Sequence, residues 1–136
     1  MPALNFKEQF VQPIILGMKP GTIRQERKQP IKVGDTLYLF TGMRTKNCRK
    51  FMTAECKAVY PIVINQTASK RFVCIDGMQL GDNSLAEFVF DDGFSSVDEF
   101  FDFFIDQYGL PFRGHWIVWK TETAQKVERF LKIASY

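Results

Sequence analysis

The sequence predicts an α+β domain in which a small, partly open β-barrel is flanked by short helices. Segments rich in β-branched and aromatic residues alternate with turn residues, and short helical patterns lie between them. The chain has 136 residues, which is enough for one hydrophobic core. Aromatic residues make up 15% of it, so the aromatic-poor composition of disordered proteins is excluded.

The first predicted element is a short helix over residues 11–16. Pro13 is tolerated in its first turn, and Gly17 is placed to end it in the left-handed conformation. After Pro20 and Gly21 the chain is expected to be extended over residues 22–24. A strand over residues 36–41 follows a series of turns.

Residues 50–64 are predicted to form one bent strand or two strands. The interruption is expected near Pro61, because proline cannot donate a hydrogen bond to the ladder. A hairpin follows, in which residues 71–75 and 78–80 flank Asp76 and Gly77. This dipeptide suits a type I′ turn, because both central residues need a positive φ.

The C-terminal half is predicted to be mostly helical. A short helix is expected over residues 84–90, and the clearest helix covers residues 97–108, where Ser95 or Ser96 can cap a phenylalanine-rich apolar face. A strand over residues 115–120 and an amphipathic helix over residues 122–131 complete the prediction. We therefore divide the chain into a domain over residues 1–121 and a helical appendage over residues 122–136.

Several protein classes are disfavoured. No apolar run approaches the roughly 20 residues that span a bilayer, and the first residues do not resemble a signal peptide. The three cysteines, Cys48, Cys56 and Cys74, contain no C-x-x-C pair, and His115 is the single histidine. We expect a cytoplasmic protein with no membrane partner, no metal and no organic cofactor.

Charge is distributed unevenly along the chain. Residues 19–50 contain many more basic than acidic residues, whereas residues 76–112 contain no Lys or Arg. Such a distribution fits a basic face that binds a polyanion opposite an acidic face. It fits equally well an ordinary set of salt bridges between the two segments.

The most informative stretch is GMKPGTIR, residues 17–24. Lys19 is expected at the mouth of a loop, and Thr22 and Arg24 project from the same side of a strand. An ammonium, a hydroxyl and a guanidinium would then converge, a group suited to an anion or to the polar edge of a base. The alternative is a charged loop beside a solvent-exposed strand end.

At these residues the sequence resembles the ASCH family of the PUA-like β-barrel group, whose hallmark G-x-K-x-x-T-x-R follows a short helix. The resemblance continues through IKVGDTLYLF and DDGFSSVDEFFDFF and covers most of residues 6–120. The stretches TGMRTKNCRK and YGLPFRGHWIVWK look most like short ASCH-like proteins encoded by phages. The resemblance implies a PUA-like barrel with a cleft for RNA, a nucleotide or a modified base.

Some small bacterial ASCH proteins are amidohydrolases that remove acetate from N4-acetylcytidine with a lysine, a threonine and a glutamate. The lysine and threonine match Lys19 and Thr22, and the glutamate falls at about Asp92, with Asp91 as the alternative. The resemblance thus implies that the Thr22 hydroxyl attacks the acetyl carbonyl and that neutral Lys19 accepts its proton. Arg24 or backbone N–H groups would stabilise the oxyanion.

Three functions remain open. The leading hypothesis is the binding of RNA, a nucleotide or a modified nucleoside in a cleft formed by Lys19, Thr22, Arg24 and Asp92. Further basic residues expected to contact phosphates are Arg44, Lys46, Arg49 and Lys50. Aromatic candidates for stacking on a base are Tyr38, Phe40, Phe94 and Trp116.

The second hypothesis is deacetylation of N4-acetylcytidine, and the third is a phage-type effector that binds a host protein through its acidic face. The oligomeric state is left open.

Overall fold

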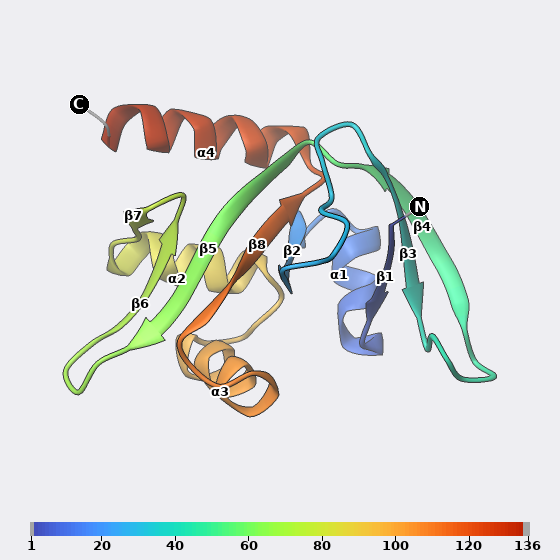
Figure 1. Cartoon of the computed structure of the whole chain (residues 1–136), viewed down its shortest axis with the longest axis horizontal. Coiled ribbons are helices and arrows are strands. Elements are labelled where there is room, and N and C mark those ends of the chain that lie inside the picture. Colours follow the sequence, from blue (N-terminus) through green and yellow to red (C-terminus); the bar gives the residue numbers. More distant parts are fainter. Residues whose placement is uncertain (1, 135–136) are drawn as a thin grey trace.

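The computed structural model describes residues 2–134 and has an α+β architecture, as predicted (Figure 1). Its eight strands form a three-stranded sheet, in the order β1-β3-β4, and a five-stranded sheet, in the order β2-β8-β5-β6-β7. The strands of the described residues do not close into a barrel, because these are two separate sheets. None of the helices within residues 2–134 combines the length and the apolar character that crossing a bilayer requires.

In the three-stranded sheet, β1 (Ala3–Phe6) runs parallel to β3 (Thr36–Thr41), which pairs antiparallel with β4 (Arg49–Glu55). Alternation along β3 buries Leu37 and Leu39 completely. A 3₁₀ turn (Glu8–Phe10) and the helix α1 (Val11–Ile15) connect β1 to the second sheet.

The five-stranded sheet has β2 (Gly21–Gln25) at its edge and β8 (Phe112–Val118) next to it. The remaining strands are β5 (Ala58–Gln66), β6 (Arg71–Ile75) and β7 (Met78–Gln79). Residues 50–64 thus belong to two strands, β4 and β5, and the break falls between Glu55 and Ala58.

The predicted interruption at Pro61 is wrong, because Pro61 lies inside β5 opposite His115 of β8. The Pro61 carbonyl accepts a hydrogen bond of 2.8 Å from the Asp76 N–H, so the polar groups of residue 61 point toward β6. The β5-β6 ladder begins only at Ile62. The missing proline N–H therefore removes no hydrogen bond to β8.

The predicted turns and helices agree closely with the structure. Asp76 and Gly77 both have positive φ, 51° and 83°. The helices α2 (Asp82–Asp91) and α3 (Val97–Gln107) correspond to the two predicted helices, and the Ser96 hydroxyl caps α3 by accepting a hydrogen bond from the Glu99 N–H.

The last helix, α4 (Thr121–Ala134), covers one end of the five-stranded sheet, and α3 lies at the opposite end (Figure 1). The Tyr60 hydroxyl in β5 donates a hydrogen bond of 2.8 Å to Glu128 of α4. Residues 135–136 of the predicted appendage lie outside the described residues. Phe100 and Phe101 of α3 are fully buried in the core.

Candidate functional site

A cavity of about 280 Å³ lies where the edge strands of the two sheets, β1 and β2, approach each other. We call it the seam cavity. Its polar lining residues are Asn5, Lys7, Lys19, Thr22, Arg24, Asp92 and Gln107. Its aromatic lining residues are Phe6, Phe10, Phe94, Phe103, Phe104 and Tyr108.

The deepest charged groups of the seam cavity are Lys19 and Asp92, which are 3% and 5% exposed. The Lys19 ammonium donates to Asp92 Oδ1 at 2.7 Å and to the Asp92 carbonyl at 2.8 Å. It also lies 4.9 Å from the centre of the Phe10 ring. Within the described residues, both hydrogen bonds of this ammonium go to Asp92, so Lys19 and Asp92 satisfy each other.

Two glycines place this pair. Gly17, with φ +77°, ends α1 in the predicted left-handed conformation, and the next two N–H groups both bond to the Pro13 carbonyl. Gly93, with φ +100°, turns the chain directly after Asp92. A Cβ at Gly93 would lie 2.9 Å from Phe10 Cδ1, so a side chain there would press against the ring beside Lys19.

Burial sets the proton affinity of both groups. Desolvation lowers the pKa of Lys19, with Arg24 adding to the decrease and Asp92 opposing it. Desolvation also raises the pKa of Asp92, against the opposing effect of Lys19. Both shifts favour the neutral form of each group, so Lys19 releases its proton more readily than a lysine in water.

Thr22 and Arg24 lie on the neighbouring wall of the cavity. Thr22 is 5% exposed, and its hydroxyl accepts a hydrogen bond of 3.3 Å from Arg24 Nε. The guanidinium also donates to the Asn5 carbonyl at 2.6 Å and lies 4.7 Å from the centre of the Phe6 ring. Arg24 therefore links the edges of the two sheets with its side chain.

The structure brings four predicted site residues, Lys19, Thr22, Arg24 and Asp92, to one cavity. Phe94 lines the same cavity. The carboxylate of the seam cavity is that of Asp92, whereas Asp91 lines a different cavity beneath α4.

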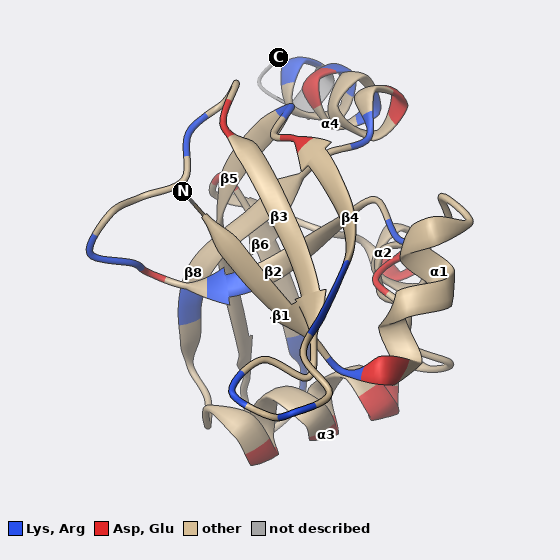
Figure 2. Ribbon diagram, turned by 90° about the vertical axis from the view of Figure 1, so that its right-hand side faces the viewer, with Lys and Arg blue, Asp and Glu red and all other residues tan. Residues whose placement is uncertain are grey.

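The basic residues Arg44, Lys46, Arg49 and Lys50 do not line the seam cavity. They lie on the hairpin between β3 and β4 and at the start of β4 (Figure 2). Arg49 pairs with Glu8 at 3.6 Å, and Lys50 lies 5.7 Å from the centre of the Tyr38 ring. The hairpin is nevertheless tied to the cavity, because the Met43 N–H donates to Asn5 Oδ1 at 3.0 Å.

Three of the aromatic residues considered for stacking lie elsewhere. Tyr38 and Phe40 are half-buried on the face of β3 opposite Leu37 and Leu39. Trp116 is 5% exposed and packs against Phe88, with ring centres 4.9 Å apart. These positions follow from strand alternation, which turns side chains to faces that do not border the cavity.

Several lining residues were not anticipated, among them Asn5, Phe10 and Tyr108. Residues 5–10 reach the cavity because β1 pairs in parallel with β3, and Tyr108 reaches it because α3 closes the seam. Neither the parallel pairing of β1 with β3 nor the position of α3 could be predicted from the residues near them in the sequence. Phe103 and Phe104, from the phenylalanine-rich face of α3, also line the cavity, and Phe104 is 2% exposed.

Comparison of the chain with protein-family models, with curated proteins and with solved structures gave no significant match.

Proposed function

We propose that the chain binds a nucleobase or nucleoside in the seam cavity, either free or as part of RNA. The observation that carries this proposal is the buried Lys19–Asp92 pair, which opens onto a cavity walled by aromatic rings. Ligand pockets in proteins typically combine apolar and aromatic walls with a few fixed polar groups. The sequence motifs further support an ASCH-type chain with a PUA-like fold.

The lining offers complementary groups for a flat heterocycle. Phe10 and Phe94 have ring centres 5.7 Å apart, and Tyr108, which is 41% exposed, stands nearer the solvent. Such rings provide stacking surfaces for a base. The Thr22 hydroxyl and the Arg24 guanidinium can bond to its polar edge. A volume of about 280 Å³ matches the lower end of small-molecule pockets, which suits a single nucleoside.

Equilibrium titration with cytidine, uridine, adenosine and N4-acetylcytidine tests this proposal. Thr22→Val keeps a β-branched residue in β2 but removes the hydroxyl, so we expect affinity to fall about tenfold while the fold is retained. Thr36→Val, at an exposed residue of β3 outside the seam cavity, is the matched control. Absence of saturable binding by every nucleoside and by a short RNA would overturn the proposal.

A second function, deacetylation of N4-acetylcytidine, is favoured by one observation: burial lowers the pKa of Lys19 beside a carboxylate and a buried threonine. In this reaction the Thr22 oxygen forms a bond to the acetyl carbon and its proton passes to neutral Lys19. The bond between the acetyl carbon and N4 then breaks, and the proton passes to N4. Water hydrolyses the Thr22 ester to release acetate.

Chromatographic detection of cytidine distinguishes the two functions. Release by the wild type that is lost in Lys19→Ala and Thr22→Ala would establish the hydrolase. Saturable binding of N4-acetylcytidine without release would refute the hydrolase and leave the binding function. Thermal unfolding of each variant serves as the control for folding.

A further inference from the structure

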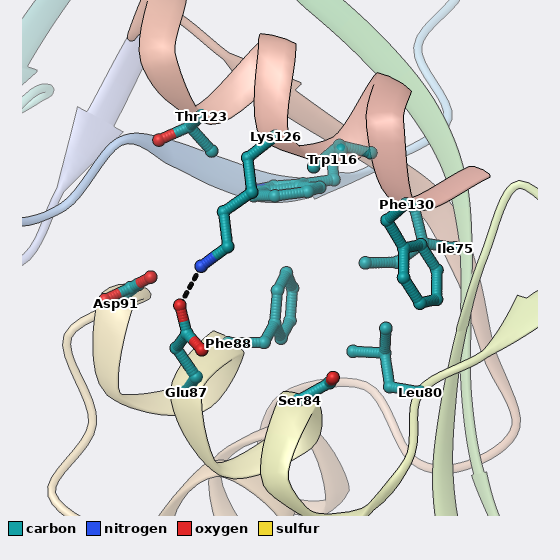
Figure 3. A pocket seen from close by; sticks show the side chains of 11 residues that line it. Ile75, Leu80, Ser84, Glu87, Phe88, Asp91, Trp116, Thr123, Lys126 and Phe130 are labelled. Atoms are coloured by element: carbon teal, nitrogen blue, oxygen red, sulfur yellow. Dashed lines mark hydrogen bonds and ion pairs between the residues drawn. The ribbon is translucent and has the colours of Figure 1, made fainter. Parts of the chain in front are cut away.

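A second cavity, of about 110 Å³, lies between α2, α4 and the five-stranded sheet (Figure 3). We call it the α4 cavity. Three aromatic side chains line it: Phe88 of α2, Trp116 of β8 and Phe130 of α4. Three aliphatic residues complete the apolar part of the lining: Ile75 of β6, Leu80, and Val127 of α4. Away from one rim, the hydroxyl groups of Ser84 and Thr123 are the polar groups in an otherwise apolar lining.

That rim carries two carboxylates. Glu87 and Asp91 are four residues apart on α2, so they occupy the same face of the helix. Lys126 reaches across from α4 and forms an ion pair with Glu87 (Figure 3). Asp91 forms no ion pair within the described residues 2–134. Of the two negative groups at this rim, only Glu87 therefore has a directly bonded cation.

The surroundings of Asp91 favour a further positive charge. The side chain is half-buried, and burial raises its pKa. Lys120 acts on Asp91 electrostatically, but its ammonium donates a hydrogen bond of 2.9 Å to the Gly17 carbonyl. A carboxylate at the edge of an apolar cavity is best stabilised by a cation that brings its own hydrogen-bond donors.

The geometry points to a binding site for a small organic ammonium ion, with its apolar group against the surface formed by Phe88, Trp116 and Phe130 and its ammonium at Glu87 and Asp91. Aromatic faces attract cations, and a carboxylate adds directed hydrogen bonds. A carboxylate ligand would have to compete with Glu87 for Lys126, and a neutral ligand would leave Asp91 unpaired. The Lys126 ammonium occupies part of this position in the free protein. Its side chain is 60% exposed, so it can turn into solvent when a ligand binds.

Titration of the full chain with three probes of the same ring size tests this inference: benzylamine, benzyl alcohol and benzoate. The resonance of the Trp116 indole N–H reports occupancy of the cavity. We expect saturable binding of benzylamine at least tenfold tighter than that of benzyl alcohol, and no binding of benzoate. Equal affinity for benzylamine and benzyl alcohol, or no saturable binding of either, would overturn the assignment.

Two substitutions locate the ammonium. Asp91→Asn should weaken benzylamine binding severalfold without changing that of benzyl alcohol, whereas Lys126→Gln should strengthen benzylamine binding, because it removes an internal competitor. Asp102→Asn, at an exposed carboxylate of α3, is the control for a general charge effect. Weaker binding in Lys126→Gln, or an equal loss in Asp102→Asn and Asp91→Asn, would contradict the proposed position of the ammonium.

Discussion

The seam cavity and the α4 cavity place their charges in opposite ways. In the seam cavity the Lys19–Asp92 pair is buried, with side chains 4% and 6% exposed. In the α4 cavity the Lys126–Glu87 pair stands at the rim, with side chains 60% and 54% exposed, and the interior is apolar. A buried pair depends on the fold to hold both partners together, because each is costly to leave alone. A pair at the rim can be exchanged for solvent or for a ligand.

The end of α2 contributes one carboxylate to each cavity, and the two carboxylates are suited to different chemistry. Asp92 faces the seam cavity and Asp91 faces the α4 cavity, although the two residues are adjacent. Dehydration at Asp92 alters the proton affinity of its partner, which is useful for reaction or for selective hydrogen bonding. The half-exposed rim at Asp91 is suited to recognition of charge.

The largest expected effect comes from breaking the buried pair. Asp92→Ala leaves the Lys19 ammonium buried without a partner, and we expect the free energy of unfolding to fall by about 3–5 kcal/mol. Urea denaturation measures it. The double variant Lys19→Met/Asp92→Leu should recover most of this loss, because no charge remains buried. A loss below about 1 kcal/mol in Asp92→Ala would mean that the pair is solvated.

The pH dependence of the same pair sharpens the comparison. Burial raises the pKa of Asp92, so its contribution to stability is present at low pH and lost as pH rises through the folded pKa. Burial lowers the pKa of Lys19, so its contribution is present at high pH and lost as pH falls through the folded pKa.

Urea denaturation across pH can compare the free energy of unfolding of the wild type with that of Lys19→Met/Asp92→Leu. Relative to the double variant, the wild type should be least stable at intermediate pH, where the contributions of both Asp92 and Lys19 have been lost. A maximum there would indicate a pair stabilised by its charges.

An intermediate effect is expected from Gly93→Ala. The positive φ and the approach to Phe10 Cδ1 together should cost about 2 kcal/mol of unfolding free energy. Gly34→Ala is the matched control, because Gly34 has φ +95° but nothing within 4 Å of the added Cβ. Thermal and urea unfolding should show a smaller loss in Gly34→Ala. Equal losses would show that the contact with Phe10 relaxes freely.

The smallest effect is expected at the rim of the α4 cavity. Glu87→Gln removes an exposed ion pair, so the free energy of unfolding should fall by no more than about 1 kcal/mol. Added salt should reduce the difference from the wild type, because it screens exposed charges. A loss as large as that of Asp92→Ala, or one insensitive to salt, would contradict the contrast between the two pairs.

Features set by a residue's own backbone preferences were predictable from the sequence. The turn at Asp76 and Gly77, the cap at Ser96 and the left-handed Gly17 all depend on local conformation. Features set by pairing between distant strands were not. Pro61 can lie inside a strand because its polar groups point toward β6 and not toward β8. The residues next to Pro61 in the sequence do not reveal on which side β6 pairs.

The candidate site divides in the same way. Lys19, Thr22 and Arg24 come from one short motif, and Asp92 was anticipated from the resemblance to ASCH proteins. Phe10 and Tyr108 complete the aromatic wall only because the two sheets and α3 meet at the seam. The division of Asp91 and Asp92 between two cavities depends on the end of α2 and also had no local signal.

The pairing of β2 with β8 joins Gly21 to Val118 and therefore orders events during synthesis. At translation rates of about 5–20 residues per second, β2 waits on the order of 5–20 s for its partner strand. During that interval residues 21–24 of the GMKPGTIR motif have no neighbouring strand with which to form a sheet. A ribosome stalled before β8 would carry every residue of the GMKPGTIR motif and Asp92, yet β2 would lack its partner strand, so the seam cavity is assembled only after β8 has been made.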